Sequence, residues 1–396
     1  MSACRLEELG LVTALGSSAR ANLERLIAGD QSRFGVTRDH VSGVERPFGA
    51  VHEPLPEISS RLARYDCRNN RLALAAVSQI RDAIEAEIER SGAQRIALVI
   101  GSSTAGVQAA ERAFEVRREH GALPDCFDLV QLEFGGPAEF LREELGIEGP
   151  CLGLSTACST GAKALLSARR LLELGICDAV VAGAVDSQCR LTANGFEELQ
   201  ALAPTLTNPM SRNRAGLTLG EGAALFLLTR DPGGVQLLGG GESSDAHHIS
   251  APEPSGSGAI RCLRAALADA GLEPGDIDYV NLHGTGTLQN DAMESRAIAS
   301  VFGLDTPCSS TKPLVGHLLG ASGAVEAGFC WLLASAPFQL PLPPHRFDGE
   351  RDPELEPISL VRAGQVATRR DGSRLCTTSF GFGGSNCALV IGAGAA

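Results

Sequence analysis

The feature that most constrains the fold of this chain is the alternation of short apolar runs with longer segments of helical periodicity. The apolar runs are bounded by glycine or polar turns, which is typical of buried strands. Their alternation with helical patterns predicts an α/β fold. The expected strands span residues 95–101, 178–186, 223–229, 235–241, 279–284, 375–380 and 387–392. The expected helices span residues 61–84, 159–175, 258–271 and 323–335.

A turn-rich segment, TRDPGG at residues 229–234, divides the chain into two sides that resemble each other. On the first side, a loop of small residues, GLSTACSTGAKALL, leads into a helix and then two strands. On the second side, CSSTKPLVGHLLGASGAVEAGFCWLL begins the same succession. A length of 396 residues also favours two domains over one. We therefore predict two halves, residues 1–230 and 231–396, with a site where their loops meet; an internal duplication remains a hypothesis.

Charge, hydropathy and cysteine use exclude several classes of function. The formal net charge of −13 argues against a nucleic-acid partner, whose binding needs clustered Lys and Arg. No apolar run approaches the length of about 18 residues that a membrane helix needs, and the N-terminus lacks the pattern of a signal peptide. The twelve cysteines are spread from Cys4 to Cys387 without a CxxC pair. We therefore expect reduced thiols, no metal site, no membrane contact and a cytoplasmic protein.

One cysteine is distinguished by its position. Cys158 follows the strand-like CLGLSTA and precedes STG, which is suited to open a helix. Backbone N–H groups and the positive end of the helix dipole would stabilise a thiolate there, and would lower the thiol pKa below its usual value of about 8.5. Position alone leaves two interpretations open, a nucleophile or a buried structural thiol like most of the other cysteines.

Two histidines lie in loops that follow or precede regular elements. His283 ends a strand and opens HGTGT, and His317 lies in the glycine-flanked segment TKPLVGHLLGASG. Such loops concentrate catalytic groups, although either histidine alone is also compatible with a satisfied core or loop position. Thr285 and Thr287 alternate after His283, so their hydroxyls either face one ligand or belong to a plain polar turn.

Two charged residues and one glycine-rich segment complete the candidate site. Lys312 in SSTKP and Glu326 in GAVEA lie among small or apolar residues, where a charge needs a partner, so we expect them to pair. The segment SFGFGGSN places Phe382 between glycines, which favours a mobile lid or a close approach of the backbone to substrate. The chain has neither GxxxxGK[ST] nor a GxGxxG after its first strand, so no phosphate-binding loop is expected.

Taken together, these segments resemble the β-ketoacyl-acyl carrier protein synthases, decarboxylating condensing enzymes with the thiolase fold. The resemblance extends from LGLVTALGSS to SFGFGGSN and depends on TACSTG, NLHGTGT, TKPLVGHLLGASGAVEA and SFGFGGSN, which occur in the order of the family. It implies a thiolase-like α/β fold in which two pseudo-duplicated halves form α-β-α-β-α layers. It also implies a dimer that works with acyl carrier protein and needs no cofactor.

The resemblance implies a decarboxylative Claisen condensation of an acyl group with malonyl-acyl carrier protein, which gives 3-ketoacyl-acyl carrier protein. Cys158 matches the nucleophile that accepts the acyl chain, and the backbone N–H groups of Cys158 and Phe382 match its oxyanion hole. His283 and His317 match the pair that hydrogen-bonds the malonyl thioester oxygen while CO2 departs. The resemblance also implies that the pathway is fatty-acid, aryl polyene or polyketide biosynthesis.

Further positions are assigned by the same resemblance. They are Lys312, which orders the site with Glu326; the supporting Asp291; the pantetheine contacts Thr285, Thr287 and Ser250; the gate Gly381, Phe382, Gly383 and Gly384; and a structural monovalent cation near Asn281, Glu326, Thr377 and Thr378. Two pocket details depart from the family. The turn after HGTGT reads LQND, without the usual Pro and Gly, and HHIS replaces a YHMT-like stretch.

The stretch RYDCRNNRL and the short length resemble ketosynthases of aryl polyene gene clusters. Those pair with a chain-length-factor-like subunit, whereas housekeeping synthases are homodimers, and both arrangements stay open. Carrier proteins are acidic, so a chain of charge −13 needs a positive docking site. Arg61, Arg64, Arg68 and Arg71 recur at helical spacing, which predicts a docking stripe on one helix face; a solvated face is the alternative.

Two rival functions have sequence criteria of their own. A thiolase would share the fold but would condense without decarboxylation, using a second cysteine where this chain has GFGG. A non-catalytic chain-length factor, the partner subunit of a heterodimeric pair, would lack the nucleophile. Because Cys158, His283 and His317 are all present, an active decarboxylating subunit is favoured.

Overall fold

Every strand expected from the sequence forms, and all belong to one sheet. The computed structural model describes residues 4–41, 43–335, 340–367 and 372–393. Its largest sheet has eleven strands, in the spatial order β13 (Ser359–Leu360), β11 (Pro307–Ser310), β10 (Tyr279–Leu282), β15 (Arg374–Gly381), β16 (Ser385–Ala393), β9 (Val235–Ser244), β1 (Arg5–Val12), β8 (Gly222–Thr229), β6 (Ala179–Asp186), β4 (Ile96–Gly101) and β5 (Cys151–Leu154). Two small sheets join β2 (Gly35–Thr37), β3 (Arg46–Gly49) and β7 (Leu219–Gly220), and β12 (Leu340–Pro341) with β14 (Val366–Ala367).

The two halves of the large sheet repeat one strand order. Counted outward from the junction, the N-terminal half runs β1-β8-β6-β4-β5 and the C-terminal half runs β9-β16-β15-β10-β11. In each half the last three strands are parallel, and the first two are antiparallel to their neighbours. The halves join through one register pair, Arg5 with Gln236. The chain therefore builds the same topology twice.

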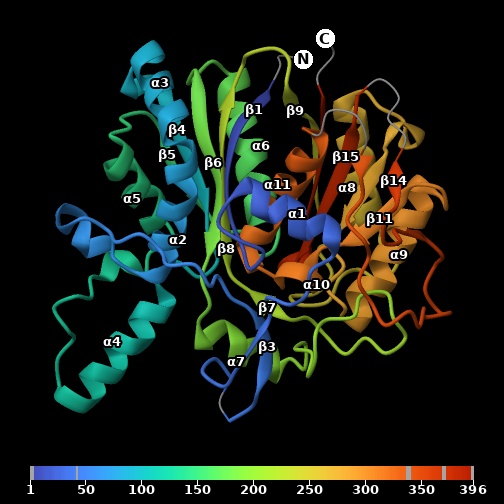
Figure 1. Cartoon of the computed structure of the whole chain (residues 1–396), viewed down its shortest axis with the longest axis horizontal. Helices are drawn as coiled ribbons and strands as arrows, with labels where there is room; N and C mark the ends of the chain where they lie inside the picture. Colours follow the sequence, from blue (N-terminus) through green and yellow to red (C-terminus); the bar gives the residue numbers. More distant parts are fainter. Residues whose placement is uncertain (1–3, 42, 336–339, 368–371, 394–396) are drawn as a thin grey trace.

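Helices form layers on and between the two half-sheets (Figure 1). The central layer is α6 (Thr160–Glu173) with α11 (Ser322–Ala334), whose side chains share one apolar core with both half-sheets. A second core lies under α2 (Arg68–Val77) and α5 (Gly136–Leu145), and a third under α8 (Ser257–Ala270) and α9 (Leu288–Phe302). The result is the expected α-β-α-β-α arrangement.

The remaining helices are α1 (Ala19–Ala28), α3 (Arg81–Ser91), α4 (Val107–His120), α7 (Arg190–Glu198) and α10 (Lys312–Val315). Sequence periodicity did not single out α1, α4, α5, α7 or α9. No helix within the described ranges is long and apolar enough to span a membrane.

The expected continuous helix over residues 61–84 is wrong. The chain forms a 3-10 turn at Ser60–Tyr65, then α2, a second 3-10 turn at Ser78–Ile80, and α3. Asp66 and Cys67 between the first two elements are extended. The Asn70 side chain donates to the carbonyl of Tyr65 at 2.8 Å and so fixes this break. This local hydrogen bond, together with the ion pair of Arg68 with the distant Glu221, therefore interrupts a segment whose sequence alone has helical periodicity.

Candidate active site

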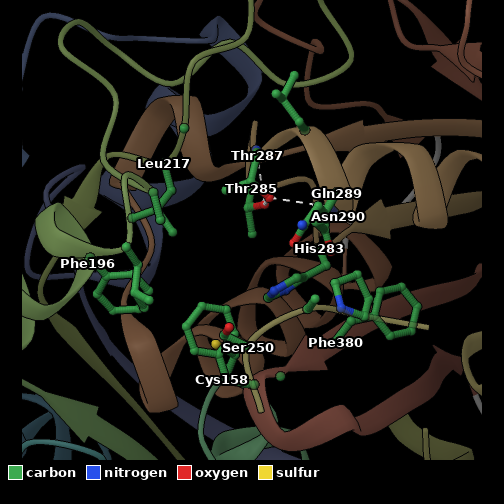
Figure 2. A pocket seen from close by; sticks show the side chains of 18 of the residues that line it. Cys158, Phe196, Leu217, Ser250, His283, Thr285, Thr287, Gln289, Asn290 and Phe380 are labelled. Carbon is green, nitrogen blue, oxygen red and sulfur yellow. Dashed lines mark hydrogen bonds between the residues drawn. The ribbon is translucent and has the colours of Figure 1, made fainter. Parts of the chain in front are cut away.

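The candidate residues gather where the carboxyl ends of the parallel strands meet. Cys158 follows β5, His283 directly follows β10, and Lys312 follows β11. Parallel strands present their carboxyl ends at one edge of a sheet, where α/β proteins place their sites. A cavity of about 470 Å³ opens there (Figure 2), and the expected residues that line it are Cys158, Ser250, His283, Thr285, Thr287, His317, Gly381 and Phe382.

A tight turn holds Cys158 at the start of α6. Ala157 has a φ of +52°, a left-handed conformation that non-glycine residues adopt rarely and mostly where the surroundings enforce it. Thr160 enforces it here, because its hydroxyl donates to the Ala157 carbonyl at 2.6 Å and accepts the N–H of Thr156 at 2.7 Å. Gly381 approaches from the other half so closely that a Cβ there would lie 3.2 Å from the Cys158 nitrogen.

The expected lowering of the Cys158 pKa is wrong in sign. Burial raises the pKa of this thiol to about 11, and the opposing effects of Lys312 and of the backbone N–H groups of Phe382 and Cys158 are smaller. Stabilisation of the thiolate by Lys312 and by these backbone N–H groups is thus present but is outweighed by desolvation. The two N–H groups that face the sulfur are the pair expected to form an oxyanion hole.

This reversal predicts the pH dependence of alkylation at Cys158. Below a pKa of about 11, the thiolate fraction rises about tenfold for each pH unit, so labelling by iodoacetamide should accelerate steadily from about pH 7 to about pH 10. Peptide mass spectrometry would measure the rate, with the exposed Cys126 as the internal reference for reagent reactivity. A Cys158 rate that levels off below pH 9 would contradict the raised pKa.

His317 is fixed in one tautomer by its own loop. Its Nδ1 accepts the backbone N–H of Leu319 at 3.0 Å and lies 3.1 Å from the Ser322 hydroxyl. A backbone N–H can only donate, so Nδ1 carries no proton and Nε2 carries one. Burial, together with Lys312, holds the pKa of His317 well below its usual value. The ring is therefore a neutral hydrogen-bond donor toward the cavity.

His283 is also held with Nδ1 as the acceptor and Nε2–H as the donor, because the Lys312 ammonium group beside Nδ1 can only donate. Lys312 Nζ lies 3.4 Å from its Nδ1, and burial with the nearby Lys312 and His317 holds its pKa well below the usual value. Glu294, which the sequence analysis missed, accepts the backbone N–H groups of His283 and Gly284, both at 2.7 Å. Burial raises the pKa of Glu294 to about 7. This carboxyl group fixes the backbone from which the His283 ring projects.

Cys158, His283 and His317 form a compact group. One N or S atom from each lies within 4.8 Å of the others, and the two imidazole rings are perpendicular with centroids 5.3 Å apart. A thiol and two imidazoles are also a ligand set that zinc accepts. The absence of a metal, expected from the sequence, stays a prediction. A thiol faced by two neutral N–H donors is equally the arrangement of acyl-transfer chemistry.

Lys312 and Glu326 pair as expected, behind the cavity wall. Lys312 Nζ lies 2.6 Å from Glu326 Oε1, and both side chains are fully buried. Burial raises the pKa of Glu326 to about 7, against the opposing effect of Lys312. Lys312 of this pair lies beside His283 and contributes to the lowered pKa of that imidazole.

Oxygen atoms beside this pair fit the cation that the family resemblance implied. Among the buried side-chain atoms without a hydrogen-bond partner are Asn281 Oδ1, Thr377 Oγ1 and Glu326 Oε2. Asn281 and Thr377 are register partners on β10 and β15. Oxygen donors of this kind suit hard cations. The fourth expected residue, Thr378, differs, because its hydroxyl donates to the Asn281 carbonyl at 3.2 Å.

The expected pantetheine contacts line the same cavity as the catalytic group. The Thr285 and Thr287 hydroxyls are 2.9 Å apart, and Ser250 lies on the wall as well (Figure 2). Asp291 does not line the cavity. It accepts the N–H of Gly286 at 3.2 Å and that of Met210 at 2.8 Å, and so ties the HGTGT loop to another segment.

The glycine-rich segment brings Phe382 into the cavity. Phe382 is 36% exposed, and its ring lies 5.5 Å from that of Phe196, centroid to centroid. Gly383 and Gly384, outside the lining, have φ values of +78° and +73°, which favour glycine. The Gly383 N–H donates to the Ile249 carbonyl at 2.7 Å and ties this segment to the cavity rim.

The four arginines of the expected docking stripe do not share one helix face. Arg61 and Arg64 belong to the exposed 3-10 turn, whereas Arg68 and Arg71 belong to α2 beyond the extended break. Arg68 is turned inward and forms an ion pair with the buried Glu221. Arg71 is half-buried and pairs with Asp66. The prediction of one continuous stripe is therefore wrong, and Arg61 and Arg64 are its exposed members, with Arg64 lying 3.6 Å from Asp128.

Fold and site together define a thiolase-fold acyltransferase. Residues 17–232 match the family model described as "Beta-ketoacyl synthase, N-terminal domain", and residues 236–336 match "Beta-ketoacyl synthase, C-terminal domain". The chain belongs to the beta-ketoacyl synthase family.

Individual relatives cover nearly the whole chain. The 3-oxoacyl-[acyl-carrier-protein] synthase 2 of Rhizobium meliloti is 33% identical over 96% of both chains, and that of Staphylococcus aureus is 29% identical over 97% of this chain and 99% of its own. Among solved structures, a chain of the complex of ketosynthase ApeO with its chain length factor ApeC from Xenorhabdus doucetiae is 40% identical. Its TM-score is 0.94, and the match covers 99% of this chain and 98% of that one.

Proposed function

We propose that this protein is the catalytic subunit of a ketosynthase that condenses an acyl group, held on Cys158, with malonyl-acyl carrier protein. The observation that carries the proposal is the compact group of one thiol and two neutral imidazoles, with the Nε2–H groups of His283 and His317 left for a ligand in the cavity. Membership of the beta-ketoacyl synthase family supports it.

The first half-reaction loads the enzyme. Cys158 Sγ attacks the thioester carbonyl of an acyl carrier protein, and the backbone N–H groups of Cys158 and Phe382 stabilise the resulting oxyanion. The carbonyl carbon then releases the pantetheine sulfur, which takes the proton that the Cys158 thiol loses. Because that thiol is largely protonated at neutral pH, proton transfer accompanies the attack and does not precede it.

The second half-reaction extends the chain. The carboxylate of the malonyl thioester leaves as CO2, and its bonding electrons form an enolate whose oxygen accepts hydrogen bonds from the Nε2–H groups of His283 and His317. The enolate carbon attacks the acyl thioester on Cys158, the carbon–sulfur bond breaks, and the thiolate regains a proton from solvent. Neutral donors suit this step, because a donor that kept a full positive charge would pair with the malonyl carboxylate and resist its loss.

The non-decarboxylating thiolase reaction is disfavoured by the composition of the cavity. Cys158 is the only cysteine among its lining residues, so no second thiol is placed to remove a proton from an acyl-CoA. A thiolase would have its second cysteine at the position of the GFGG segment, and in this chain that segment contains no cysteine.

For the pathway and partner, we propose a polyene-forming ketosynthase that pairs with a chain-length-factor-like subunit. The 40% identity to a chain of the ApeO–ApeC complex supports this assignment over a housekeeping homodimer. β5 forms one edge of the large sheet, and Leu152 on it is 41% exposed, so a second subunit along this edge would cover apolar surface. A cytoplasmic location is part of the same proposal.

A monovalent cation bound by Asn281, Thr377 and Glu326 would have a structural role in this enzyme. It would satisfy three buried oxygen atoms and balance the carboxylate of Glu326 beside the catalytic group.

For carrier docking, we propose that Arg61 and Arg64 contact the acidic carrier protein. The double variant Arg61→Glu/Arg64→Glu should raise the KM for acyl carrier protein about tenfold, because like charges weaken the encounter, and should leave activity on a small thioester mimic unchanged. The matched control is Arg20→Glu/Arg90→Glu, which makes the same charge change at two exposed surface positions. Equal KM values for the two double variants would contradict the assignment.

The function is tested by following Cys158 through one turnover. The purified protein, with and without a chain-length-factor-like subunit, is incubated with saturated and polyenoyl carrier thioesters, and intact mass reports acylation. Malonyl carrier protein is then added, and the 3-ketoacyl product and CO2 are measured. Polyenoyl loading followed by extension supports the specialised pathway, and extension of saturated chains alone supports a housekeeping synthase. A protein that loads acyl groups and never extends them is not a condensing enzyme.

A further inference from the structure

A buried carboxylate that the mechanism does not use lies between the two halves of the molecule. Asp186 is the last residue of β6 and is fully buried. Its Oδ1 accepts four hydrogen bonds, all at 2.8 Å, from the Ser102 hydroxyl, the Ser103 N–H, and the N–H and hydroxyl of Thr104. Burial raises the pKa of Asp186 to about 6, against the effect of these donors. This oxygen is thus anchored within the N-terminal half.

The other oxygen of Asp186 reaches into the C-terminal half. Oδ2 accepts the N–H of Ala321 at 3.1 Å; the same N–H also reaches the Leu318 carbonyl at 3.0 Å. Gly320 lies against the carboxylate, and a Cβ there would come within 2.8 Å of Oδ2 and 2.5 Å of Ser103 Oγ. The segment between His317 and α11 is therefore pressed onto Asp186 without room for a side chain.

This segment determines the state of His317. Leu319 has a φ of +52°, a strained conformation for a branched side chain, and its N–H is the donor that keeps the proton off His317 Nδ1. β7 and the residue before it hold the opposite side of the segment. The His317 N–H donates to the Thr218 carbonyl at 2.7 Å, and the Gly220 N–H donates to the His317 carbonyl at 3.0 Å. Strained conformations persist only where their surroundings hold them, and the contacts of Asp186 with Ala321 and Gly320 are next to Leu319 in the chain.

We propose that Asp186 is a positioning residue that keeps the 317–321 segment strained, so that Leu319 fixes His317 with its Nε2–H toward the cavity. The inference depends on the proposed function, because it assigns Asp186 to malonyl decarboxylation and not to acyl loading. Cys158 receives its orientation from Thr160 and Gly381, neither of which bonds to Asp186.

The variant Asp186→Asn isolates the contact between the halves. An asparagine has nearly the same shape, with one oxygen and one NH2 group. The four donors around Oδ1 retain the oxygen, so the NH2 group faces the N–H of Ala321, and two donors cannot bond to each other. The strained segment then loses its anchor while Asp186 keeps its place in the N-terminal half.

Two half-reactions are measured separately on the full-length protein. Loading is the rate of Cys158 acylation by acyl carrier protein, read by intact mass, and decarboxylation is CO2 release from malonyl carrier protein. We expect Asp186→Asn to lose between about 10- and 100-fold in decarboxylation, the usual effect of a displaced catalytic group, with loading retained. The control, Ser102→Ala, removes a hydrogen bond to Oδ1 and leaves the Ala321 contact, so neither rate should change appreciably.

Two further readouts keep the proposal falsifiable if Asp186→Asn folds poorly. Gly320→Ala pushes the same segment away from Asp186 and should show the same loss of decarboxylation. Its loading rate is not part of the test, because the added Cβ also comes 3.2 Å from Thr160 Cβ, beside Cys158. Histidine nitrogen NMR should show the Nε2–H tautomer of His317 in the wild type and a mixture of tautomers in folded variants.

The outcomes separate this inference from the proposed function. If the wild type does not decarboxylate malonyl carrier protein, the proposed function fails. If the wild type is active and folded Asp186→Asn decarboxylates equally fast, or loses both rates to the same extent, the positioning role is overturned and the function stands.

Discussion

Cys158→Ala loses about 10⁴-fold or more of its condensation rate, because the lining of the cavity holds no other cysteine that could take up the acyl chain. Malonyl decarboxylation persists in the same variant. The contacts that orient the two imidazoles come from Leu319, Ser322 and Lys312, so removing the sulfur leaves both Nε2–H donors in place.

The two activities of Cys158→Ala are read in parallel assays. Intact mass should show no acyl adduct after incubation with acyl carrier protein, and CO2 release from malonyl carrier protein should continue. The exposed Cys126 supplies the control, because Cys126→Ala should keep both activities. Condensation by Cys158→Ala, or an acyl adduct on a different cysteine, would exclude Cys158 as the nucleophile.

His283→Ala and His317→Ala show the reverse pattern. Each variant removes one preorganised donor to the enolate oxygen, which costs about 10²- to 10³-fold in rate. Acyl loading continues, because the oxyanion of that step is held by the backbone N–H groups of Cys158 and Phe382. The double variant falls by less than the product of the single effects, since the two donors act on one oxygen.

Decarboxylation by the histidine variants is measured as CO2 release at saturating malonyl carrier protein, and loading is measured by intact mass. His52→Ala, at an exposed position outside the cavity, is the control and keeps both rates. Histidine variants that cannot be loaded would mean that an imidazole removes the Cys158 proton, and the division of labour between the two steps would then be wrong.

Strands were easier to predict than helices in this chain. A run such as RIALVIG is apolar because β4 is covered on both faces, so burial is visible in the sequence itself. The prediction of one helix over residues 61–84 failed because the break after Tyr65 is stabilised by contacts that the pattern of apolar residues does not show. Arg68, for example, is drawn to Glu221, far along the chain.

The candidate site was predictable in composition but not in electrostatics. Cys158, His283 and His317 stand in loops after or before regular elements, and their family pattern placed them together. The sign of the Cys158 pKa shift was missed, because a helix terminus is visible in sequence whereas the depth of burial is not. Glu294 had one usable indication, an acidic residue on the first helix after HGTGT, three positions beyond Asp291.

One half supplies the Cys158 sulfur and the other supplies both imidazoles. The rate of catalysis therefore reports whether the two halves are correctly packed against each other. Each half carries its own outer core, yet neither holds a complete set of reacting groups. A chain cut at the 229–234 turn would therefore regain turnover only when both fragments reassociate in register. The recovery of activity on mixing the two fragments would then measure how tightly the two halves bind each other.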